Sequence, residues 1–208
     1  MTAPASSSAR FLIVGPQGSG KGTQGVLVAE AFEVPSISTG DVFRENISGA
    51  TELGGRVQAI VEAGDLVPDE LTCELVRDRL EQPDAARGFL LDGFPRNRVQ
   101  VDDLEDFLAS RGEALDAVIE LVVPREESIA RLRQRAIDQG RTDDTEEVIA
   151  NRLAIYERET APILDVYRGR GLVLRIDGVG SLADVTARIF EALATRGLVP
   201  AHPVHGAA

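Results

Sequence analysis

The stretch GPQGSGKGTQ, residues 15–24, decides the fold expected for the rest of this sequence. It follows the apolar run Phe11–Val14, which is typical of a buried strand, and it leads into a helical pattern. A glycine-rich loop between a strand and a helix aims backbone N–H groups and the positive helix end at an anion. Lys21, within this loop, is the only lysine of the chain, because all the other basic residues among the 22 are arginines. Because lysine is a compact point charge and arginine a wide fork, we expect Lys21 to reach a bound phosphate.

The composition fits one domain with an aliphatic core. The chain has 208 residues, of which 43% are hydrophobic but only 4% aromatic, and its net charge is −12. So acidic a chain is not expected to bind nucleic acid or a membrane surface, both of which favour a basic face. The one cysteine, Cys73, excludes an intramolecular disulfide and a cysteine-rich zinc site. It also agrees with a reducing compartment, so we expect a cytoplasmic protein.

Neither end of the sequence predicts a membrane or targeting segment. The opening MTAPASSSAR lacks the apolar core of a secretory signal, and no apolar run approaches the roughly 18 residues that span a bilayer. We expect flexible tails over residues 1–9 and 198–208. Both histidines, His202 and His205, fall in the second tail, which removes histidine from the candidate acid–base chemistry.

Short apolar runs alternate with helical patterns along the chain. The runs expected to be strands are Phe11–Val14, Val34–Ser38, Phe89–Leu91, Ala117–Val123 and Leu172–Ile176. Helical periodicity predicts helices over Thr23–Phe32, Leu53–Ala63, Asp69–Glu81, Val99–Ser110, Glu126–Arg135, Thr145–Tyr167 and Leu182–Arg196. This alternation predicts an α/β fold whose parallel sheet has helices on both faces.

Two segments depart from simple alternation. Residues 38–67 contain more helix than one crossover needs, and residues 134–144 form a short polar loop between two helices. Loosely packed segments of this kind supply the moving parts of many sites, so both are candidates for mobile elements.

The loop at residues 15–24 resembles the phosphate loop of the nucleoside monophosphate kinases, and of the adenylate kinases in particular. The resemblance continues through ISTGDVFR (37–44), AGDLVPDEL (63–71), GFLLDGFPRNRVQ (88–100) and the arginines after Pro124, and it covers roughly residues 10 to 195. Gly22 departs from the general phosphate-loop pattern, in which Ser or Thr follows the lysine directly. Gln17 stands where adenylate kinases typically carry proline.

The resemblance implies a phosphate-loop kinase fold with a five-stranded parallel sheet. Residues 10–197 would form one kinase domain, with residues 38–67 as a small helical insertion that binds the acceptor and residues 134–144 as a short lid. Long-lid relatives have a larger domain there that sometimes holds zinc; this chain lacks both the length and the cysteines, so no zinc is expected.

The implied activity is that of a short-lid adenylate kinase, a monomer that transfers phosphoryl from ATP to AMP with Mg²⁺ and yields two ADP for adenine nucleotide homeostasis. Two alternatives stay open. One is a UMP/CMP kinase of the same fold, and the other is an adenylate-binding protein with impaired catalysis, which only Gln17 favours.

The resemblance also implies the donor-binding residues. They are the phosphate-loop residues, two arginines and a glycine beside the donor adenine: Gly18, Ser19, Gly20, Lys21, Gly22, Thr23, Arg131, Arg135 and Gly180. Asp92 would orient magnesium, directly or through water. The alternative for Asp92 is a helix or turn cap.

The acceptor site follows in the same way. Its implied residues are Thr39, Arg44, Asp65, Leu66, Val67, Gly93, Phe94, Pro95, Arg96, Gln100, Arg141 and Arg152. Thr39 and Gln100 would select AMP, although Asn97 is similar to the pyrimidine-specific relatives, and the local sequence also favours Thr39 as a helix N-cap.

Positive charge around the transferred phosphoryl group would come from Lys21, Arg96, Arg131, Arg135, Arg141 and Arg152, the implied catalytic residues. The alternative for the arginines after Pro124 is a set of solvated surface side chains paired with nearby acids.

Overall fold

The computed structural model describes residues 9–139 and 145–201. Its core is a five-stranded, entirely parallel sheet in the order β2-β3-β1-β4-β5. The strands are β1 (Ala9–Val14), β2 (Ser36–Ser38), β3 (Gly88–Asp92), β4 (Ala117–Val122) and β5 (Val173–Asp177). Each expected strand is therefore present, and the predicted five-stranded parallel sheet is confirmed.

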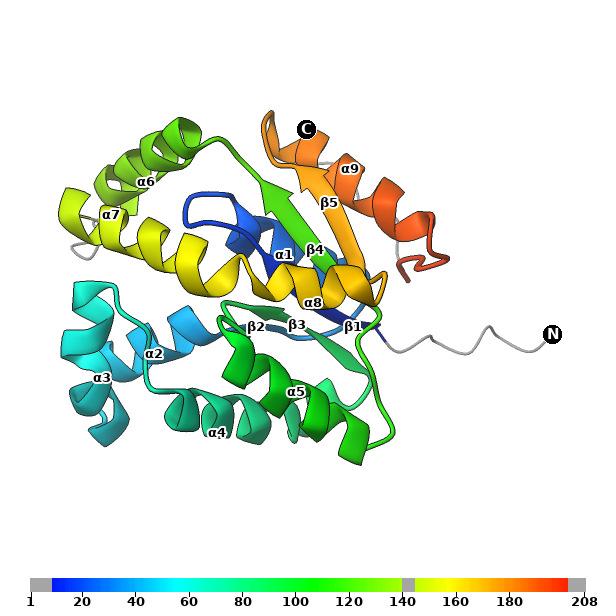
Figure 1. The fold of residues 1–208 in the computed structure, drawn as a ribbon, viewed down its shortest axis with the longest axis horizontal. Coiled ribbons are helices and arrows are strands. Elements are labelled where there is room, and N and C mark those ends of the chain that lie inside the picture. Colours follow the sequence, from blue (N-terminus) through cyan, green and yellow to red (C-terminus); the bar gives the residue numbers. More distant parts are fainter. Residues whose placement is uncertain (1–8, 140–144, 202–208) are drawn as a thin grey trace.

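Helices follow the strands in the expected alternation. The α-helices are α1 (Lys21–Ala31), α2 (Thr39–Ser48), α3 (Glu52–Ala63), α4 (Asp69–Leu80), α5 (Arg98–Ser110), α6 (Arg125–Gln139), α7 (Glu146–Ile155), α8 (Ile163–Gly169) and α9 (Leu182–Ala194). A short 3₁₀ turn, η1 (Pro83–Ala85), precedes β3, and a π-helical turn, η2 (Tyr156–Thr160), joins α7 to α8. Figure 1 shows the sheet running between these helices.

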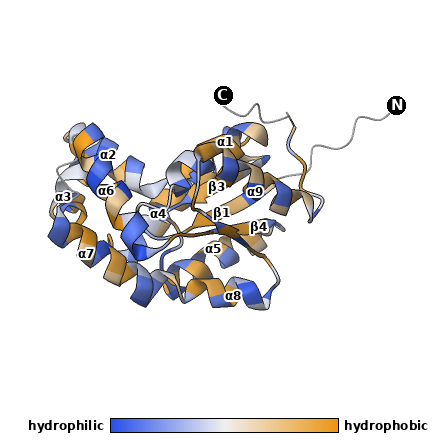
Figure 2. Ribbon diagram, turned by 90° about the horizontal axis from the view of Figure 1, so that it is seen from above, coloured by the Kyte–Doolittle hydropathy of each residue, from blue (hydrophilic) through white to orange (hydrophobic). Residues whose placement is uncertain are grey.

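Alternate residues of β1 face two separate cores. Leu12 and Val14 pack with residues of α4, α5 and α8 on one face of the sheet. Phe11 and Ile13 pack with α1 and α9 on the other. Because successive strand side chains point to opposite faces, a continuous apolar strand fills both cores at once. In Figure 2 the strands are largely orange, whereas the helices carry both colours.

The segment between β2 and α4 forms a small body with its own apolar contacts. Helices α2 and α3 pack around Phe43 and Val57, together with Val67. Gly54 allows their close approach, because a Cβ at that position would lie 2.1 Å from the backbone oxygen of Asn46. These helices lie at the same end of the molecule as α6 and α7 (Figure 1). The insertion expected from the sequence is thus a helical hairpin.

One predicted helix and one predicted loop differ in detail from the structure. The predicted helix Thr145–Tyr167 is interrupted, since Ala161 N–H bonds to the Tyr156 carbonyl five residues earlier. Pro162 has no N–H and cannot continue the regular ladder, which explains the break. The polar loop predicted from Gln134 is also wrong at its start, because α6 continues to Gln139. Gln134 Nε2 donates to Asp138 Oδ1 at 2.8 Å, an i,i+4 contact that supports the extra turn.

The boundaries of the expected tails also shift. Ala9 is already the first, buried residue of β1. Leu198 packs against the core shared by α1 and α9, and the Ala201 N–H donates to the Ala31 carbonyl at 2.9 Å. The first residues after position 197 are therefore attached to the domain, because their apolar side chain and backbone both find partners. Residues 1–8 and 202–208, including both histidines, lie outside the described residues.

Candidate nucleotide and phosphoryl-transfer site

The phosphate loop wraps tightly between β1 and α1. Gly18 and Gly20 have φ angles of 80° and 90°, which favour glycine. A Cβ on Gly18 would lie 2.4 Å from the Ser128 carbonyl oxygen, so this part of the loop rests on α6. Helix α1 begins at Lys21, two residues earlier than expected, and Gly20 supplies no side-chain cap. Its first N–H groups are thus left to receive an anion.

Lys21 lies at the centre of a cluster of charges. Its Nζ lies 3.4 Å from the Pro16 carbonyl oxygen, across the loop. Burial lowers the pKa of Lys21, and the nearby Arg96, Arg135 and Arg44 lower it too, whereas Asp92 opposes them. A bound anion among these cations would relieve their mutual repulsion.

Asp92 is the last residue of β3, beside the phosphate loop. It pairs in register with Ile13 of β1, and its side chain is buried. Burial raises the pKa of Asp92, while Lys21 and Arg96 oppose that shift. Its Oδ1 has no hydrogen-bond partner among the described residues, so Asp92 does not act as a turn cap through this atom.

Thr39 occupies the first turn of α2 but does not cap it. The cap is Ser38, whose side chain accepts from the Asp41 N–H at 3.3 Å. The alternative role of Thr39 as an N-cap is therefore wrong by one residue, because Thr39 already belongs to the helix. Its Oγ1 instead donates to the Gly93 carbonyl at 3.0 Å, which ties α2 to the turn after β3.

The turn after β3 also fixes Arg96. The Arg96 Nε donates to the Gly93 carbonyl at 2.7 Å. Burial lowers the pKa of Arg96, and Arg152 and Arg44 add to that effect, against Asp92. Arg44 itself pairs with Asp41. The forked end of Arg96 is held near two other arginines, which is an arrangement that suits a phosphate.

Gln100 lies in α5, buried to 2% exposure, and both ends of its amide have partners. Its Nε2 donates to Asp69 Oδ1 at 2.7 Å, and its Oε1 accepts from the Arg96 N–H at 2.8 Å. Asn97 caps α5 by accepting from the Gln100 N–H at 3.0 Å, and its Nδ2 donates to Asp69 at 2.8 Å. Asp69 is a functional candidate that the sequence did not reveal, because no local pattern links it to a position 31 residues away.

The arginines after Pro124 take different positions. Arg131 donates to the Gly178 carbonyl at 3.2 Å and pairs with Glu127, whereas Arg133 is exposed and pairs with Glu146 at 2.6 Å. Arg152 donates to the Val61 carbonyl at 3.2 Å, so α7 touches the insertion. Arg141 lies outside the described residues, as does part of the lid proposed at 134–144.

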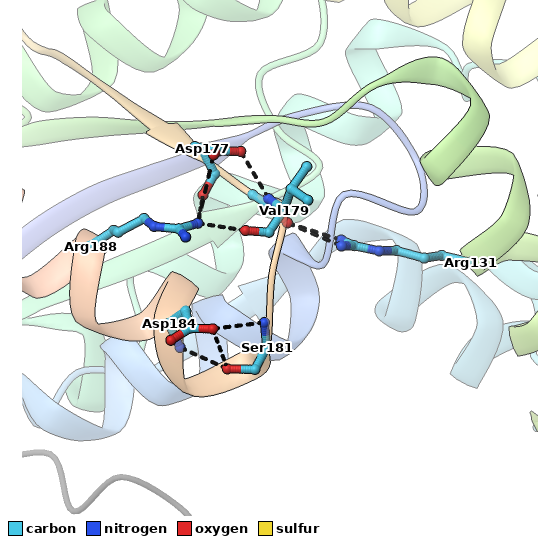
Figure 3. Close-up of polar contacts among 7 residues, drawn as sticks. Arg131, Asp177, Val179, Ser181, Asp184 and Arg188 are labelled. Carbon is cyan, nitrogen blue, oxygen red and sulfur yellow. Dashed lines mark hydrogen bonds and ion pairs between the residues drawn. The ribbon is translucent and has the colours of Figure 1, made fainter.

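The loop between β5 and α9 is stiffened by arginines from two directions (Figure 3). Arg188 donates to the Asp177 and Val179 carbonyls at 2.8 and 2.6 Å, and Arg131 approaches from the opposite side. Ser181 and Asp184 form a reciprocal capping box at the start of α9. Gly180, with φ 124°, lies in this loop. Sequence reasoning missed Arg188 because a single arginine on an amphipathic helix carries no signal of its own.

A single cleft of about 440 Å³ brings most of the predicted site residues together. Those that line it are Gly18, Gly20, Lys21, Gly22, Thr23, Thr39, Arg44, Asp65, Leu66, Val67, Asp92, Gly93, Arg96, Gln100, Arg131, Arg135 and Arg152. Phe94 and Pro95 instead line a small adjoining cavity, and Ser19, within the loop, is buried. Gly180 does not line the cleft.

Two further observations concern the residues that the structure describes. They contain no cluster of three or more His, Cys, Asp or Glu side chains that could hold a metal ion. In the same part of the chain, no helix has the length and apolar character needed to cross a membrane.

A phosphate loop, a facing set of arginines and a helical insertion on one parallel sheet define the class of nucleoside monophosphate kinases. Comparison with known proteins gives the particular family. The family model described as adenylate kinase matches residues 13–172, and the chain belongs to the adenylate kinase family. It is therefore a phosphotransferase of the nucleoside monophosphate kinase class.

Relatives named adenylate kinase match nearly the whole chain. One from Leifsonia xyli is 56% identical over 91% of this chain and 96% of the relative. One from Clavibacter michiganensis is 55% identical over 92% of this chain and 96% of the relative. A third, from Thermobifida fusca, is 52% identical, and the match covers 90% of this chain and 99% of that protein.

Proposed function

We propose that this chain transfers the γ-phosphoryl group of ATP to AMP and releases two ADP. One observation carries the proposal: the phosphate loop with Lys21 and the acceptor-side arginines Arg44 and Arg96 line the same cleft. ATP and AMP can therefore bind in this cleft with the phosphates of one directed toward the phosphate of the other. A local cluster of cations in so acidic a chain favours a ligand of opposite charge.

On the donor side, the backbone of residues 18–23 and Lys21 would hold the ATP phosphates. Arg131 and Arg135 lie on one face of α6, four residues apart, and line the same cleft. Arg131 also contacts the carbonyl of Gly178, so it would couple the phosphate site to the loop proposed to cradle the donor adenine near Gly180.

On the acceptor side, Arg44, Arg96 and Arg152 would bind the AMP phosphate, and Thr39 and Gln100 would contact its base. The contacts of Asn97 support AMP over UMP or CMP. Its amide is used at both ends, by the α5 N-terminus and by Asp69. Asn97 also does not line the cleft, whereas Thr39 and Gln100 do. Its resemblance to pyrimidine-specific relatives is therefore explained by helix capping and needs no role in reading the base.

The residues present fit a magnesium ion bound mainly through phosphates and water. Asp92 offers a buried oxygen with no partner among the described residues, and Thr23 lines the cleft nearby. When bound, the ion would neutralise charge on the donor phosphates. A site with so few protein oxygens suits magnesium, which keeps several waters.

The chemistry needs no nucleophilic side chain from the protein. Phosphoryl transfer depends on in-line positioning and on fixed positive charge, which Lys21 and the arginines supply. We propose that residues 38–67 and 134–144 close over the substrates and exclude water, so that AMP accepts the group. The contact of Arg152 with Val61 supports this, since it joins the insertion to α7 in the described part of the chain. Arg141 would join the cluster from the lid.

We also propose that the enzyme works as a cytoplasmic monomer in adenine nucleotide homeostasis. Cys73, its only cysteine, is a buried free thiol, which agrees with a reducing compartment.

A coupled assay that follows ADP formation tests the proposal, with ATP as donor and AMP, UMP, CMP or GMP as acceptor. AMP should give the highest kcat/KM, and Lys21→Ala should lower turnover by about two orders of magnitude or more, because a lost electrostatic contact of this kind costs that much. Arg133→Ala is the matched control on α6, since Arg133 is exposed and paired with Glu146. A preference for UMP or CMP, or tight binding without ADP formation, would refute the proposal.

A further inference from the structure

The amide of Gln100 is held in one orientation by two neighbours of opposite hydrogen-bonding character. Asp69 can only accept a hydrogen bond through its carboxylate, so the group that meets it at 2.7 Å must be the NH₂ of Gln100. The Arg96 backbone N–H can only donate, so the group that meets it at 2.8 Å must be the carbonyl oxygen. The two constraints agree, and the amide cannot turn over without losing both bonds.

Asn97 makes this arrangement rigid. Its Nδ2 donates to the same Asp69 Oδ1 at 2.8 Å, while its Oδ1 accepts from the Gln100 N–H. One oxygen of Asp69 thus accepts hydrogen bonds from two amide NH₂ groups at the start of α5. It does so from the first turn of α4, two positions after Val67, the last of the residues 65–67 that line the cleft.

The orientation matters because of what remains free. An amide NH₂ has two hydrogens and its oxygen two lone pairs, so each end of Gln100 keeps one position for a ligand. Adenine presents an acceptor, N1, next to a donor, the N6 amino group. Hypoxanthine, which differs by one substituent, presents a donor at N1 next to an acceptor at O6. An amide held one way round can pair with the first pattern and mismatches the second.

We propose that Asp69 is a positioning residue for base selection, which sets the amide of Gln100 in the orientation that accepts AMP and rejects IMP. The inference rests on the proposed function, since it assumes that Gln100 contacts the base of the acceptor. Asp69 itself need not touch the nucleotide. It acts by fixing which end of the amide is the donor.

Two substitutions at this position separate the positioning role from a structural one. Asp69→Ala removes the acceptor. Asp69→Asn keeps one side-chain oxygen that can accept from the NH₂ groups of Gln100 and Asn97. The new amide should present this oxygen to them, because the opposite orientation would bring three NH₂ groups together. Both variants remove the same negative charge from the first turn of α4. Asp69→Ser shortens the side chain, so that its hydroxyl oxygen stands back from both amides; it is a second variant that weakens the acceptor if the alanine variant fails to fold.

The measurement is kcat and KM for AMP and for IMP at saturating ATP. In Asp69→Ala and Asp69→Ser, the ratio of kcat/KM for AMP to that for IMP should fall about tenfold or more, which is the usual effect of losing one hydrogen bond to a charged group. The change should appear in KM for AMP, with KM for ATP unchanged. Asp69→Asn should stay within about threefold of the parent ratio, because neutral hydrogen bonds are weaker but oriented alike.

Glu70→Ala is the matched control, since Glu70 lies beside Asp69 in the first turn of α4 and is exposed. Equal ratios in the parent, Asp69→Ala and Asp69→Ser would overturn the inference, and so would an equal fall in the alanine and asparagine variants. The proposed function fails separately, if the parent chain makes no ADP from ATP and AMP. If Gln100→Ala lowers the ratio and Asp69→Ala does not, the function stands and the role of Asp69 is wrong.

Discussion

At the scale of the residue, Lys21 combines a charge with a shape that no other cation of this chain has. Its Nζ reaches the Pro16 carbonyl oxygen across a loop whose glycines at positions 18 and 20 have left-handed φ angles. Arginines reach the cleft from the insertion, from the turn after β3 and from α6 and α7. The loop therefore carries the compact ammonium of Lys21, while the planar guanidinium groups of the arginines lie around it.

Lys21→Arg should consequently lose most of its activity even though it keeps the charge. We expect kcat to fall about a hundredfold, because a planar guanidinium cannot replace a compact ammonium in a closed loop. The check is the coupled assay at saturating ATP and AMP, with Arg133→Lys on the surface of α6 as the control. Activity within tenfold of the parent would mean that the position requires charge alone.

Cys73 gives a second prediction at this scale. It is 4% exposed, and burial together with Asp103 raises the pKa of its thiol to about 12. Because the thiolate is the reactive form, the native chain should react far more slowly with a disulfide reagent at pH 8 than the chain in denaturant. Equal rates in the two states would contradict both the burial and the raised pKa.

At the scale of the element, the helical hairpin α2–α3 depends on one close backbone approach. Gly54 and Gly55 are neighbours in α3, but only Gly54 faces the end of α2. A Cβ at Gly54 would lie 2.1 Å from the Asn46 carbonyl oxygen, whereas a Cβ at Gly55 would meet nothing within 4 Å. The two positions form a natural matched pair.

Gly54→Ala should therefore push α2 away from α3 and weaken AMP binding. We expect KM for AMP to rise several-fold with KM for ATP unchanged, together with a loss of about 1–3 kcal/mol in stability from overpacking. Gly55→Ala should leave both constants unchanged and stabilise α3 slightly, by up to about 1 kcal/mol. Steady-state kinetics and thermal unfolding check both variants, and identical behaviour of the two would refute the packing argument.

At the scale of the whole molecule, two cores on opposite faces of the sheet support one cleft at the ends of its strands. The catalytic residues proposed for the cleft line its surface, whereas the residues of the two cores do not. Stability and activity should therefore be separable by substitution.

Leu104→Ala in α5 tests this separation. Leu104 is 1% exposed in the core shared with α4 and α8, so its loss should cost about 2–5 kcal/mol of the free energy of unfolding. Val99→Ala on the exposed face of the same helix should cost less than about 0.5 kcal/mol. Urea unfolding gives the free energies, and KM values at a temperature where both variants are folded should match the parent. A large change in KM for Leu104→Ala would show that core and cleft are coupled.

Much of the fold follows from patterns that are local in the sequence. Strand alternation, helical periodicity and the glycine-rich loop each extend over a few residues, and all five strands appear where those patterns place them. The breaks were harder to predict. Pro162 marked the interruption between α7 and α8, but the π-helical turn that accommodates it depends on how the chain packs after the break.

Residue type and short spacing were enough to predict the phosphate loop, the parallel sheet and the family. The tertiary fold was needed to show that Ser38 rather than Thr39 caps α2, and that Asn97 caps α5 and donates to Asp69. It alone joined Asp69 to Gln100 across 31 positions and Arg131 to Gly178 across 47. Hydrogen bonds between distant residues require both partners to be positioned by the fold, and no local pattern records which partner will be there.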